Sequence, residues 1–532
     1  MTALSRPGNN KLFQDLFFFG TFVLIAALPL SKFAMSVAQF VMLGSWLFSG
    51  SYKMKAVPQK WCLPFIALPL IYLIHVAGLI HTTDFSYAFK DLRIKLPMLA
   101  LPVLFYTGPQ LEKKHFDRLL LGMIAGTTVA VLLGLFKWLG LGGKPITDIR
   151  EISIYVSHIR LSLLICLSLI ACLWFVVGEH RFAPVLVPVA LLLFAFLFIL
   201  ESLTGIGILI IVLFVLGIRR SIQLENKWWK SILIAFSVML PLGSAVYVNS
   251  VWESFRHHDT VNFATLESYT PSGNKYQHYP ELRDYENGHC IWIYVCEKEL
   301  QQQWNKRSSF AYSGKDSRGQ DLRFTLIRYL SSKDLRKDSA GVWALNGDDI
   351  SAIEKGVANM HYKARSSVYG RVHQVIWEIE HYRAGGDPSG HSLTMRWVYW
   401  KTALHIIRDH PWAGVGTGDL PEAYHQQYIK DHTVLSEHWR LRAHNQYLSI
   451  AVAFGIPALL FFVLMLILVL RHQMRQKDTL FLAFWLIAML SMLTEDTLET
   501  QAGVTFFTVF YCLFLFVNPQ KRTCNGNVGP LG

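Results

Sequence analysis

His444 lies between Arg442 and Asn445, just before an apolar stretch that runs from Ser449 to Leu470. A stretch of that length can span a bilayer, so these three polar residues are expected at the membrane surface, at the start of a helix. The first turn of a helix carries unpaired N–H groups and the positive end of the helix dipole, which attract anions and disfavour protonation of a nearby imidazole. His444 is therefore a candidate general base, a neutral imidazole that takes a proton from a reacting group.

Further charged residues are expected at the same face of the membrane as His444. They stand at the ends of other apolar stretches: Arg93, Lys95, His158, Arg160, Arg396, Glu495, Asp496 and Glu499. A guanidinium group keeps its charge and presents a planar fork of donors that matches two phosphate oxygens, so the arginines are candidate ligands of a diphosphate. The simpler interpretation is a side chain that reaches lipid headgroups, above all for Lys95, or an ordinary loop histidine in the case of His444. Convergence of these residues on one face favours a binding site.

Two other patterns carry less information. Gly414-Val-Gly-Thr-Gly418 resembles a phosphate-binding loop, but no strand precedes it and no Lys-Ser/Thr pair follows it, so we expect a turn between two helices. Cys290 and Cys296 lie in a long polar stretch, where a disulfide would require a turn between them. Their spacing shows no metal-ligand pattern, and we expect neither a metal nor a cofactor.

The composition indicates a membrane protein. Of the 532 residues, 52% are hydrophobic and only 16% are charged, a balance too apolar for an ordinary soluble enzyme. The net charge of +13 would suit a nucleic-acid-binding protein, but the basic residues form short clusters between apolar stretches, as the positive-inside rule expects. We therefore expect membrane lipids around the chain and no nucleic acid as a partner.

About twelve apolar stretches are long enough for membrane helices. They lie near 14–31, 33–49, 61–80, 96–108, 118–140, 158–178, 183–200, 205–218, 230–249, 446–470, 478–494 and 502–518. The sequence therefore predicts an all-α polytopic membrane protein with an N-terminal membrane region at 1–249, a large loop at 250–445, C-terminal membrane helices at 446–518 and a tail at 519–532. The distribution of Lys and Arg places both termini in the cytoplasm and the large loop in the periplasm.

The large loop is too long for a simple connection, and helical patterns recur in it. Helices are expected at 321–335, 349–362, 368–382 and 394–409, the first two as surface helices. The last one carries Arg396 beside a helical stripe of apolar residues. Pro411 is expected to end it.

Three motifs in this part of the chain together resemble the O-antigen ligase family, which shares a domain with O-antigen polymerases. They are Arg396-x-x-x-Trp400, His410-Pro-Trp-Ala-Gly-Val-Gly-Thr-Gly-Asp419, and His444-Asn-Gln-Tyr-Leu448 followed by Gly455-Ile-Pro457. Their order and spacing carry the resemblance, and the hydrophobic layout with its large loop before the third-last span is also similar. The chain departs from the family at Ser202-Leu203-Thr204, where the family often has a Ser-Arg pair, and in the apparent enlargement of the loop at 253–362.

The resemblance implies a membrane-embedded glycosyltransferase of lipopolysaccharide biosynthesis in the bacterial inner membrane. Such an enzyme moves a glycan, at the periplasmic face and without a metal, from a polyprenyl diphosphate such as undecaprenyl diphosphate to lipid A-core. It also implies that Arg396 and His444 form the essential pair.

This chemistry agrees with the residues. A sugar hydroxyl is a poor nucleophile at neutral pH, so a base such as His444 should take its proton as it attacks. The leaving diphosphate gains charge, which Arg396 and Arg160, with Arg93, Lys95 and Arg442, are expected to stabilise. A single displacement would invert the anomeric centre. Supporting roles are expected for His158, Asn445, Glu495 and Glu499.

Three hypotheses about function stay open at this point. The first is the ligase with a lipid A-core acceptor, and the second is a polymerase or a protein O-glycosylating enzyme of the same family, which differs only in its acceptor. The third, and the least favoured, is a flippase of lipid-linked glycans. A transporter should carry its ionisable residues near the middle of the membrane in broken helices, whereas here the charges gather at one face.

Overall fold

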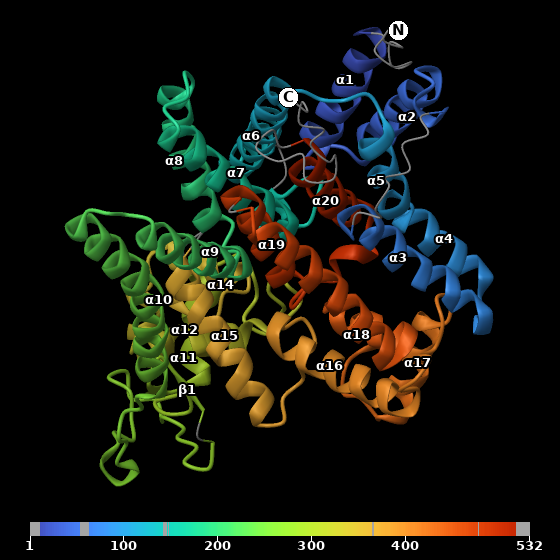
Figure 1. The fold of residues 1–532 in the computed structure, drawn as a ribbon. Helices are drawn as coiled ribbons and strands as arrows, with labels where there is room; N and C mark the ends of the chain where they lie inside the picture. Colours follow the sequence, from blue (N-terminus) through green and yellow to red (C-terminus); the bar gives the residue numbers. More distant parts are fainter. Residues whose placement is uncertain are drawn as a thin grey trace, which may run out of the picture. The chain divides into compact units, whose positions relative to one another are not determined.

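The computed structural model describes residues 11–53, 63–141, 146, 148–282, 284–363, 367–476 and 478–517. The chain forms two compact units, both built mainly of helices (Figure 1). The membrane unit comprises Met1–Val238 and Gly385–Gly532, and the inserted unit comprises Met239–Ala384. The inserted unit is shorter than the loop predicted at 250–445, because the residues from Gly385 onward pack in the membrane unit.

A helix lies at each of the predicted apolar stretches. These helices are α1 (Lys11–Ala27), α2 (Lys32–Phe48), α3 (Leu63–Ala77), α5 (Pro97–Thr107), α6 (Lys113–Trp138), α7 (His158–Val177), α8 (Ala183–Ile199), α9 (Leu203–Ile222), α10 (Lys227–Arg256), α18 (Gln446–Met474), α19 (Thr479–Ser491) and α20 (Gln501–Cys512). Six helical stretches are long and apolar enough to cross a membrane, those that contain α3, α6, α7, α9, α10 and α18. The protein is thus a mainly helical membrane protein, and the number of twelve crossings stays a prediction.

The membrane unit is organised around α20. Every residue from Ala502 to Cys512 is buried, and α20 contacts α5 and the short α4 (Phe85–Lys95). At the other extreme, only 6% of the most apolar window of α10, which runs from the membrane unit into the inserted unit, is buried within the chain. The sequence did not predict α4, because its charged residues interrupt the apolar pattern on which the membrane-helix prediction rests.

Two further helices of the membrane unit lie outside the apolar stretches. They are α16 (Ser392–Asp409), which begins two residues before the predicted start, and α17 (Leu420–Lys430). Both precede α18 in the chain, and α16 packs against α17 and α18 (Figure 1). They connect the inserted unit to the C-terminal membrane helices.

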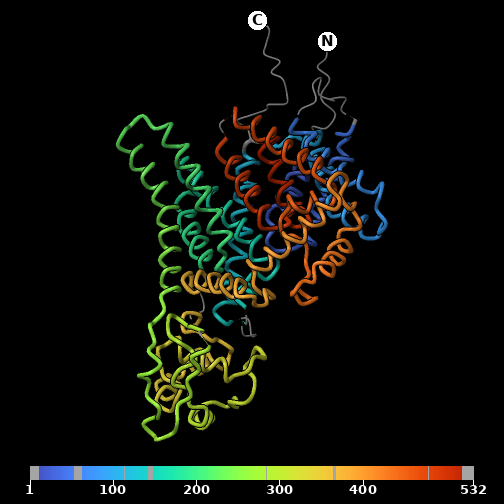
Figure 2. Tube along the Cα trace, turned by 90° about the horizontal axis from the view of Figure 1, so that it is seen from below, coloured from blue at the N-terminus to red at the C-terminus, as the bar shows by residue number. Residues whose placement is uncertain are grey.

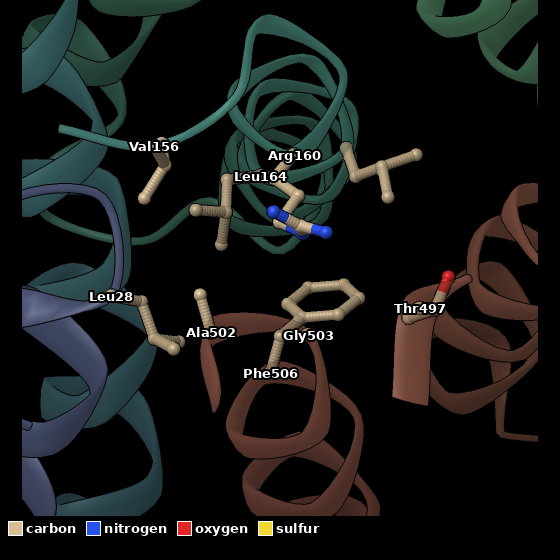
Figure 3. A pocket seen from close by; sticks show the side chains of 9 residues that line it. Leu28, Val156, Arg160, Leu164, Thr497, Ala502, Gly503 and Phe506 are labelled. Atoms are coloured by element: carbon tan, nitrogen blue, oxygen red, sulfur yellow. The ribbon is translucent and has the colours of Figure 1, made fainter. Parts of the chain in front are cut away.

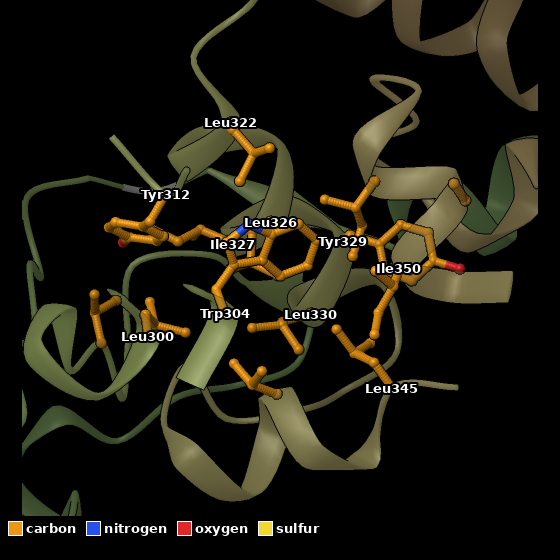
Figure 4. Packing of buried hydrophobic residues seen from close by; sticks show 14 of the residues in the cluster. Leu300, Trp304, Tyr312, Leu322, Leu326, Ile327, Tyr329, Leu330, Leu345 and Ile350 are labelled. Atoms are coloured by element: carbon orange, nitrogen blue, oxygen red, sulfur yellow. The ribbon is translucent and has the colours of Figure 1, made fainter. Parts of the chain in front are cut away.

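The inserted unit has its own hydrophobic core. Short helices joined by long loops surround it (Figure 2). They are α11 (Glu297–Arg307), α12 (Leu322–Ser332), α13 (Ser339–Ala344), α14 (Gly347–Glu354) and α15 (Val368–Arg383). Trp304 of α11 and Leu326, Ile327, Tyr329 and Leu330 of α12 are fully buried at its centre (Figure 4). Burial of so many large apolar side chains makes this unit a folded domain rather than a flexible loop.

Three sequence predictions for this unit need correction. The helix predicted at 321–335 is not on the surface, because eight of the eleven residues of α12 are buried. The helix predicted at 349–362 ends at Glu354, because Gly356 adopts a φ of +76° that breaks it, and only the short turn Met360–Tyr362 follows. The unit also contains a small antiparallel hairpin, β1 (Tyr285–Glu286) with β2 (His289–Cys290). Cys290 and Cys296 are both free thiols.

Candidate functional site

An acidic segment between α19 and α20 organises the site. It comprises residues 494–499, ends in the short helix η7 (Thr497–Glu499), and contains Glu495, Asp496 and Glu499. Asp496 and Glu499 are 8% and 9% exposed, and the side chain of Glu495 is 12% exposed. Each carboxylate contacts a different predicted site residue, so one short segment holds the three together.

Asp496 fixes the turn that carries His444. Its Oδ2 accepts the backbone N–H of His444 at 3.1 Å, and its Oδ1 accepts the N–H of Asn445 at 3.0 Å and the hydroxyl of Ser449 at 2.7 Å. The Asn445 side chain caps α18 by accepting the N–H groups of Tyr447 and Leu448. A buried carboxylate on these donors adds to the favourable electrostatics of a helix N-terminus and makes the turn rigid.

Aromatic side chains fix the segment 439–443, which leads to His444. Tyr399 of α16 donates its hydroxyl hydrogen to the carbonyl of Trp439, and Trp400 donates its indole N–H to the carbonyl of Ala443 at 2.9 Å. Tyr428 of α17 donates to the carbonyl of Leu441. Three side chains from two helices satisfy alternate carbonyls. Residues 439–443 are therefore fixed, although 440–443 have no regular secondary structure.

The imidazole of His444 is buried on one side and open on the other. The residue has a φ of +47°, the left-handed region, which turns its side chain away from the axis of α18. Its Nδ1 is buried and has no hydrogen-bond partner among the described residues, while the residue as a whole is partly exposed. Because Nε2 is not among the buried unpaired atoms, it is the nitrogen that a substrate can reach.

Arg396 is held by the acidic segment from the side of α16. Its Nε donates to the carbonyl of Thr494 at 3.1 Å, its Nη1 to the carbonyl of Ser392 at 2.9 Å, and its Nη2 to Glu495 at 3.2 Å. A guanidinium group has five N–H donors, so two are left over after these three bonds. The side chain is 17% exposed. Arg396 is therefore oriented in advance, with donors to spare for an anion.

Glu499 sits in a buried ion network. Its carboxylate accepts from Lys95 at 2.7 Å, from Arg442 at 3.1 Å and from Gln446 at 3.0 Å, and Lys95 also donates to Asp91 at 2.6 Å. Burial alone would raise the pKa of Glu499, but the charges of Lys95 and Arg442 outweigh it and hold that pKa well below its usual range. Burial, together with the negative charge of Glu499, raises the pKa of Asp91 to about 6 against the opposing charges of Lys95 and Arg442.

Arg160 differs from the other cations, because its guanidinium makes no hydrogen bond or ion pair with any residue that the structure describes. It lines a small, mostly apolar pocket near the start of α7, with Thr497 of the acidic segment and Gly503 and Phe506 of α20 (Figure 3). The negative charges of Glu495 and Asp496 act on it. An unpaired guanidinium in such a pocket is suited to bind an anion that the protein does not supply.

One predicted residue, Arg93, is not part of this arrangement. Arg93 lies on the exposed face of α4, two residues from both Asp91 and Lys95, which point inward. His158 is the first residue of α7, after its N-cap Ser157. The structure therefore brings together Arg396, Arg442, His444, Asn445, Lys95, Glu495 and Glu499, places Arg160 beside them, and leaves Arg93 outside.

Comparison with known proteins gives one match. Residues 350–463 match the family model described as O-antigen ligase. We call residues 350–463 the O-antigen ligase domain, after the family that they match. No curated protein matches the chain. The O-antigen ligase domain contains Arg396, Arg442, His444 and Asn445, and the resemblance inferred from the sequence motifs is confirmed over this part of the chain. The acidic segment, Lys95 and Arg160 lie outside the matched residues.

The glycine-rich motif Gly414–Gly418 of the O-antigen ligase domain bonds backbone groups that are left free where α18 is interrupted. Gly455 has a φ of +81°, which interrupts the helix, and the freed carbonyls of Val452 and Ala453 accept the N–H groups of Val415 and Gly416 at 3.0 and 2.9 Å. In return, the N–H of Ile456 donates to the carbonyl of Pro411 at 2.8 Å. The chain thus satisfies within the protein the backbone groups that a broken membrane helix would leave unpaired.

The same bonds exclude the phosphate-loop interpretation of this motif. Besides Val415 and Gly416, the N–H groups of Gly414, Thr417 and Gly418 all donate to protein acceptors, with the last reaching the Thr82 hydroxyl at 3.2 Å. No N–H of the loop is left for a phosphate. The sequence prediction of a positioning turn agrees with this geometry. Asp419, which follows, accepts from Thr83 and Asp84 at the start of α4 and ties the loop to the helix that carries Lys95.

Sequence reasoning missed several residues that build the site. Asp496 was noted only as one of three acidic residues, although it makes three bonds around His444. Asp91 could have been found from its i,i+4 spacing to Lys95, which is typical of an ion pair on a helix. Gln446, fully buried, bonds both Glu499 and the backbone of Leu498, and no local pattern marks it. Among the described residues, no group of three or more His, Cys, Asp or Glu side chains is arranged to hold a metal ion.

Proposed function

We propose that this protein transfers a glycan from a polyprenyl diphosphate to a lipid acceptor, lipid A-core, at the periplasmic face of the bacterial inner membrane. One observation carries the proposal. The imidazole of His444 and the guanidinium of Arg396, both in the O-antigen ligase domain, are held by the same acidic segment, which lies outside that domain. A base and an anion-binding group at a fixed separation are what displacement of a diphosphate by a hydroxyl requires.

In the proposed reaction, the acceptor hydroxyl oxygen attacks the anomeric carbon of the donor sugar. The bond from that carbon to the diphosphate oxygen breaks, and the electron pair leaves with the diphosphate. Nε2 of His444 takes the hydroxyl proton, so the product is a glycoside and the imidazole becomes imidazolium. The single displacement inverts the anomeric centre. The donor is already activated by its diphosphate, so the step does not depend on a nucleotide.

Arg396 and Arg160 are the proposed ligands of the departing diphosphate. Arg396 has two N–H groups left after its three protein contacts, and Arg160 has its whole fork available. Arg160 lies two residues before Ser162, whose hydroxyl accepts a hydrogen bond from Ser202, and Ser202 begins the stretch where the family often has a Ser-Arg pair. Arg160 therefore supplies, from α7, a phosphate contact that Ser202-Leu203-Thr204 does not.

Lys95 and Arg442 take a different role from the one the sequence suggested. Lys95 is 1% exposed, and three hydrogen bonds to Asp91 and Glu499 use all its donors. Arg442 is bound to the same Glu499. We therefore propose that they position the acidic segment, with Arg442 within reach of a substrate because its side chain is 27% exposed.

Deletion of the gene, followed by gel analysis of lipopolysaccharide, tests this function. A ligase predicts the loss of every glycan-capped species, with restoration by the wild-type gene and not by His444→Ala. Survival of a cap with a single repeat unit would identify a polymerase instead. Unchanged lipopolysaccharide together with loss of glycan from a protein would identify a protein O-glycosylating enzyme.

A further inference from the structure

Two buried polar atoms, one in the proposed base and one in a tyrosine of α17, lack hydrogen-bond partners among the described residues. One is Nδ1 of His444, and the other is the hydroxyl of Tyr424 on α17. Buried polar groups are nearly always paired, because an unpaired one costs on the order of 1–3 kcal/mol. Two such atoms in one region of a protein therefore call for a common explanation.

The residues that carry the two atoms are both related to Asp496, which bonds the backbone of His444 and acts electrostatically on Tyr424. The Tyr424 hydroxyl lies beside the backbone of Ala443, the residue before His444, and within the field of Asp496, Arg442 and Glu499. Asp496 binds the backbone N–H of His444 through Oδ2, which accepts no other bond from the described residues. Tyr399 contributes the remaining polar neighbour, its ring 5.7 Å from that of His444, but its hydroxyl is committed to the carbonyl of Trp439.

The proposed chemistry sets a requirement on Nδ1. A neutral imidazole accepts a proton on Nε2 only in the tautomer that carries its hydrogen on Nδ1. That N–H is buried here, so without an acceptor the other tautomer, which has its hydrogen on the reachable Nε2 and is inactive as a base, is favoured. A base in this position needs an acceptor for Nδ1–H.

We propose that Tyr424 is the positioning residue of the base: its hydroxyl oxygen accepts Nδ1–H of His444, directly or through one water, while its own hydrogen is donated to Oδ2 of Asp496. The inference rests on the proposed function. Catalytic hydrogen bonds are often long or poorly aligned without substrate and tighten when it binds, so a small rotation of the two side chains completes the arrangement.

No proton moves along this chain of hydrogen bonds. Burial raises the pKa of the Tyr424 hydroxyl well above its usual range, so it stays protonated beside Asp496. When Nε2 takes the proton of the acceptor hydroxyl, the imidazolium keeps its Nδ1–H bond, and the negative charge of Asp496 stabilises it through the tyrosine. Tyr424 thus selects the tautomer before the reaction and favours the charged ring during it.

Tyr424→Phe tests this role, with Tyr428→Phe as the matched control. Tyr428 is one turn away on α17, and its hydroxyl holds the same stretch of chain through Leu441. With purified full-length protein, Tyr424→Phe should lower kcat about tenfold, leave the KM for the lipid-linked donor unchanged, and move the acidic limb of the pH–rate profile to lower pH. Tyr428→Phe should lower the thermal unfolding temperature without moving that limb. Equal effects of the two variants on the pH profile, or an unmoved profile in Tyr424→Phe, would overturn the proposal.

Nitrogen NMR of ¹⁵N-histidine-labelled protein reads the tautomer without any activity. The His444 signals, assigned by their loss in His444→Ala, should report hydrogen on Nδ1 in the wild type and in Tyr428→Phe, and a shift toward Nε2 in Tyr424→Phe. The same tautomer in all three proteins would refute the role of Tyr424. If the wild type shows the Nδ1–H tautomer but no glycan transfer, the proposed function fails while the hydrogen bond stands.

Discussion

At the level of residues, His444 gains its role from backbone geometry that its neighbours impose. A φ of +47° is uncommon for any residue except glycine, although histidine adopts it more readily than bulky residues. Asp496, Asn445 and the aromatic side chains of α16 and α17 maintain this conformation. The imidazole is consequently presented beside α18 with Nδ1 inside and Nε2 outside.

Replacement of His444 by alanine should abolish transfer. A general base contributes on the order of a hundredfold to ten-thousandfold, and alanine offers no atom to take the proton. Binding of the lipid-linked donor should survive, because it depends on Arg396 and Arg160. The measurements are transfer to purified acceptor and donor binding, each with and without EDTA. Retained transfer in the variant would refute the base, and EDTA-sensitive transfer restored by a divalent cation would refute a metal-free reaction.

Arg396→Lys should be nearly as inactive as Arg396→Ala, although it keeps the charge. The guanidinium makes three bonds to the acidic segment and its own helix and still has two donors for the diphosphate, whereas an ammonium group has three donors in all. Both variants should lose on the order of a hundredfold in kcat/KM. Lys401→Arg, at an exposed position of the same helix, is the control. Near-normal activity of Arg396→Lys would mean that charge alone suffices.

At the level of elements, the site depends on α18, a helix that is interrupted at Gly455 and whose free backbone groups bond to the loop before it. His444 stands just before α18, whose first part ends at Gly455, and the loop from Pro411 to Thr417 supplies the bonds that the break removes. Asp419 and Thr417 then connect that loop to α3 and α4. The glycine-rich motif and the Gly-Ile-Pro motif are therefore two halves of one structure, which explains why they occur together in this chain.

Gly455→Ala tests this arrangement. A methyl group at this position would lie 2.4 Å from the carbonyl oxygen of Trp412, and alanine does not readily adopt a φ of +81°. We expect the free energy of unfolding in detergent to fall by about 1–3 kcal/mol or more, with loss of transfer. Gly44→Ala in α2, where no atom lies within 4 Å of the added methyl, is the control and should be neutral. Normal stability of Gly455→Ala would show that the break is not required.

At the scale of the molecule, the sequence predicted the apolar helices well and their mutual contacts poorly. Long apolar runs are a local signal, so helices were found at every predicted position, while α4 escaped because Asp91 and Lys95 interrupt its pattern. His444 and Arg396, the proposed base and the proposed ligand of the diphosphate, were singled out from motifs. The contacts of the acidic segment with both residues were not predicted. Its hydrogen bonds join residues about 50 to 400 positions apart, such as Glu499 and Lys95, and a single sequence does not reveal such pairs.

The inserted unit should unfold in acid by a mechanism of its own. Glu299, 2% exposed, accepts from Thr270, Asn274 and the N–H of Ser339; burial opposes its charge, but these bonds lower the pKa of Glu299 to about 2. A carboxyl pKa below its value in the unfolded chain stabilises the fold above about pH 4.5, and this contribution is lost as the pH falls toward 2.

Hydrogen exchange of peptides from α11 and α12 in the full-length protein measures this loss. Protection should decrease between pH 4.5 and 2 in the wild type, and Glu299→Gln should be less protected at pH 7 and depend less on pH. Glu267→Gln removes an exposed ion pair with Arg336 and should change little. An unchanged pH dependence in Glu299→Gln would assign the acid sensitivity to other carboxyl groups.

The proposed orientation in the membrane places the loop predicted at 250–445 in the periplasm, and labelling of single cysteines tests it. Lys114, Lys227 and Arg383 all have exposed side chains, so a thiol at any of them is accessible unless the membrane shields it. With the seven native cysteines replaced, the distribution of basic clusters predicts that Lys114→Cys and Lys227→Cys resist an impermeant reagent in intact cells, while Arg383→Cys reacts. All three should react after the cells are opened, which shows that each site is present. The reverse labelling pattern would place His444 on the cytoplasmic side of the membrane. A periplasmic acceptor does not reach that side, so this result would refute the proposed reaction.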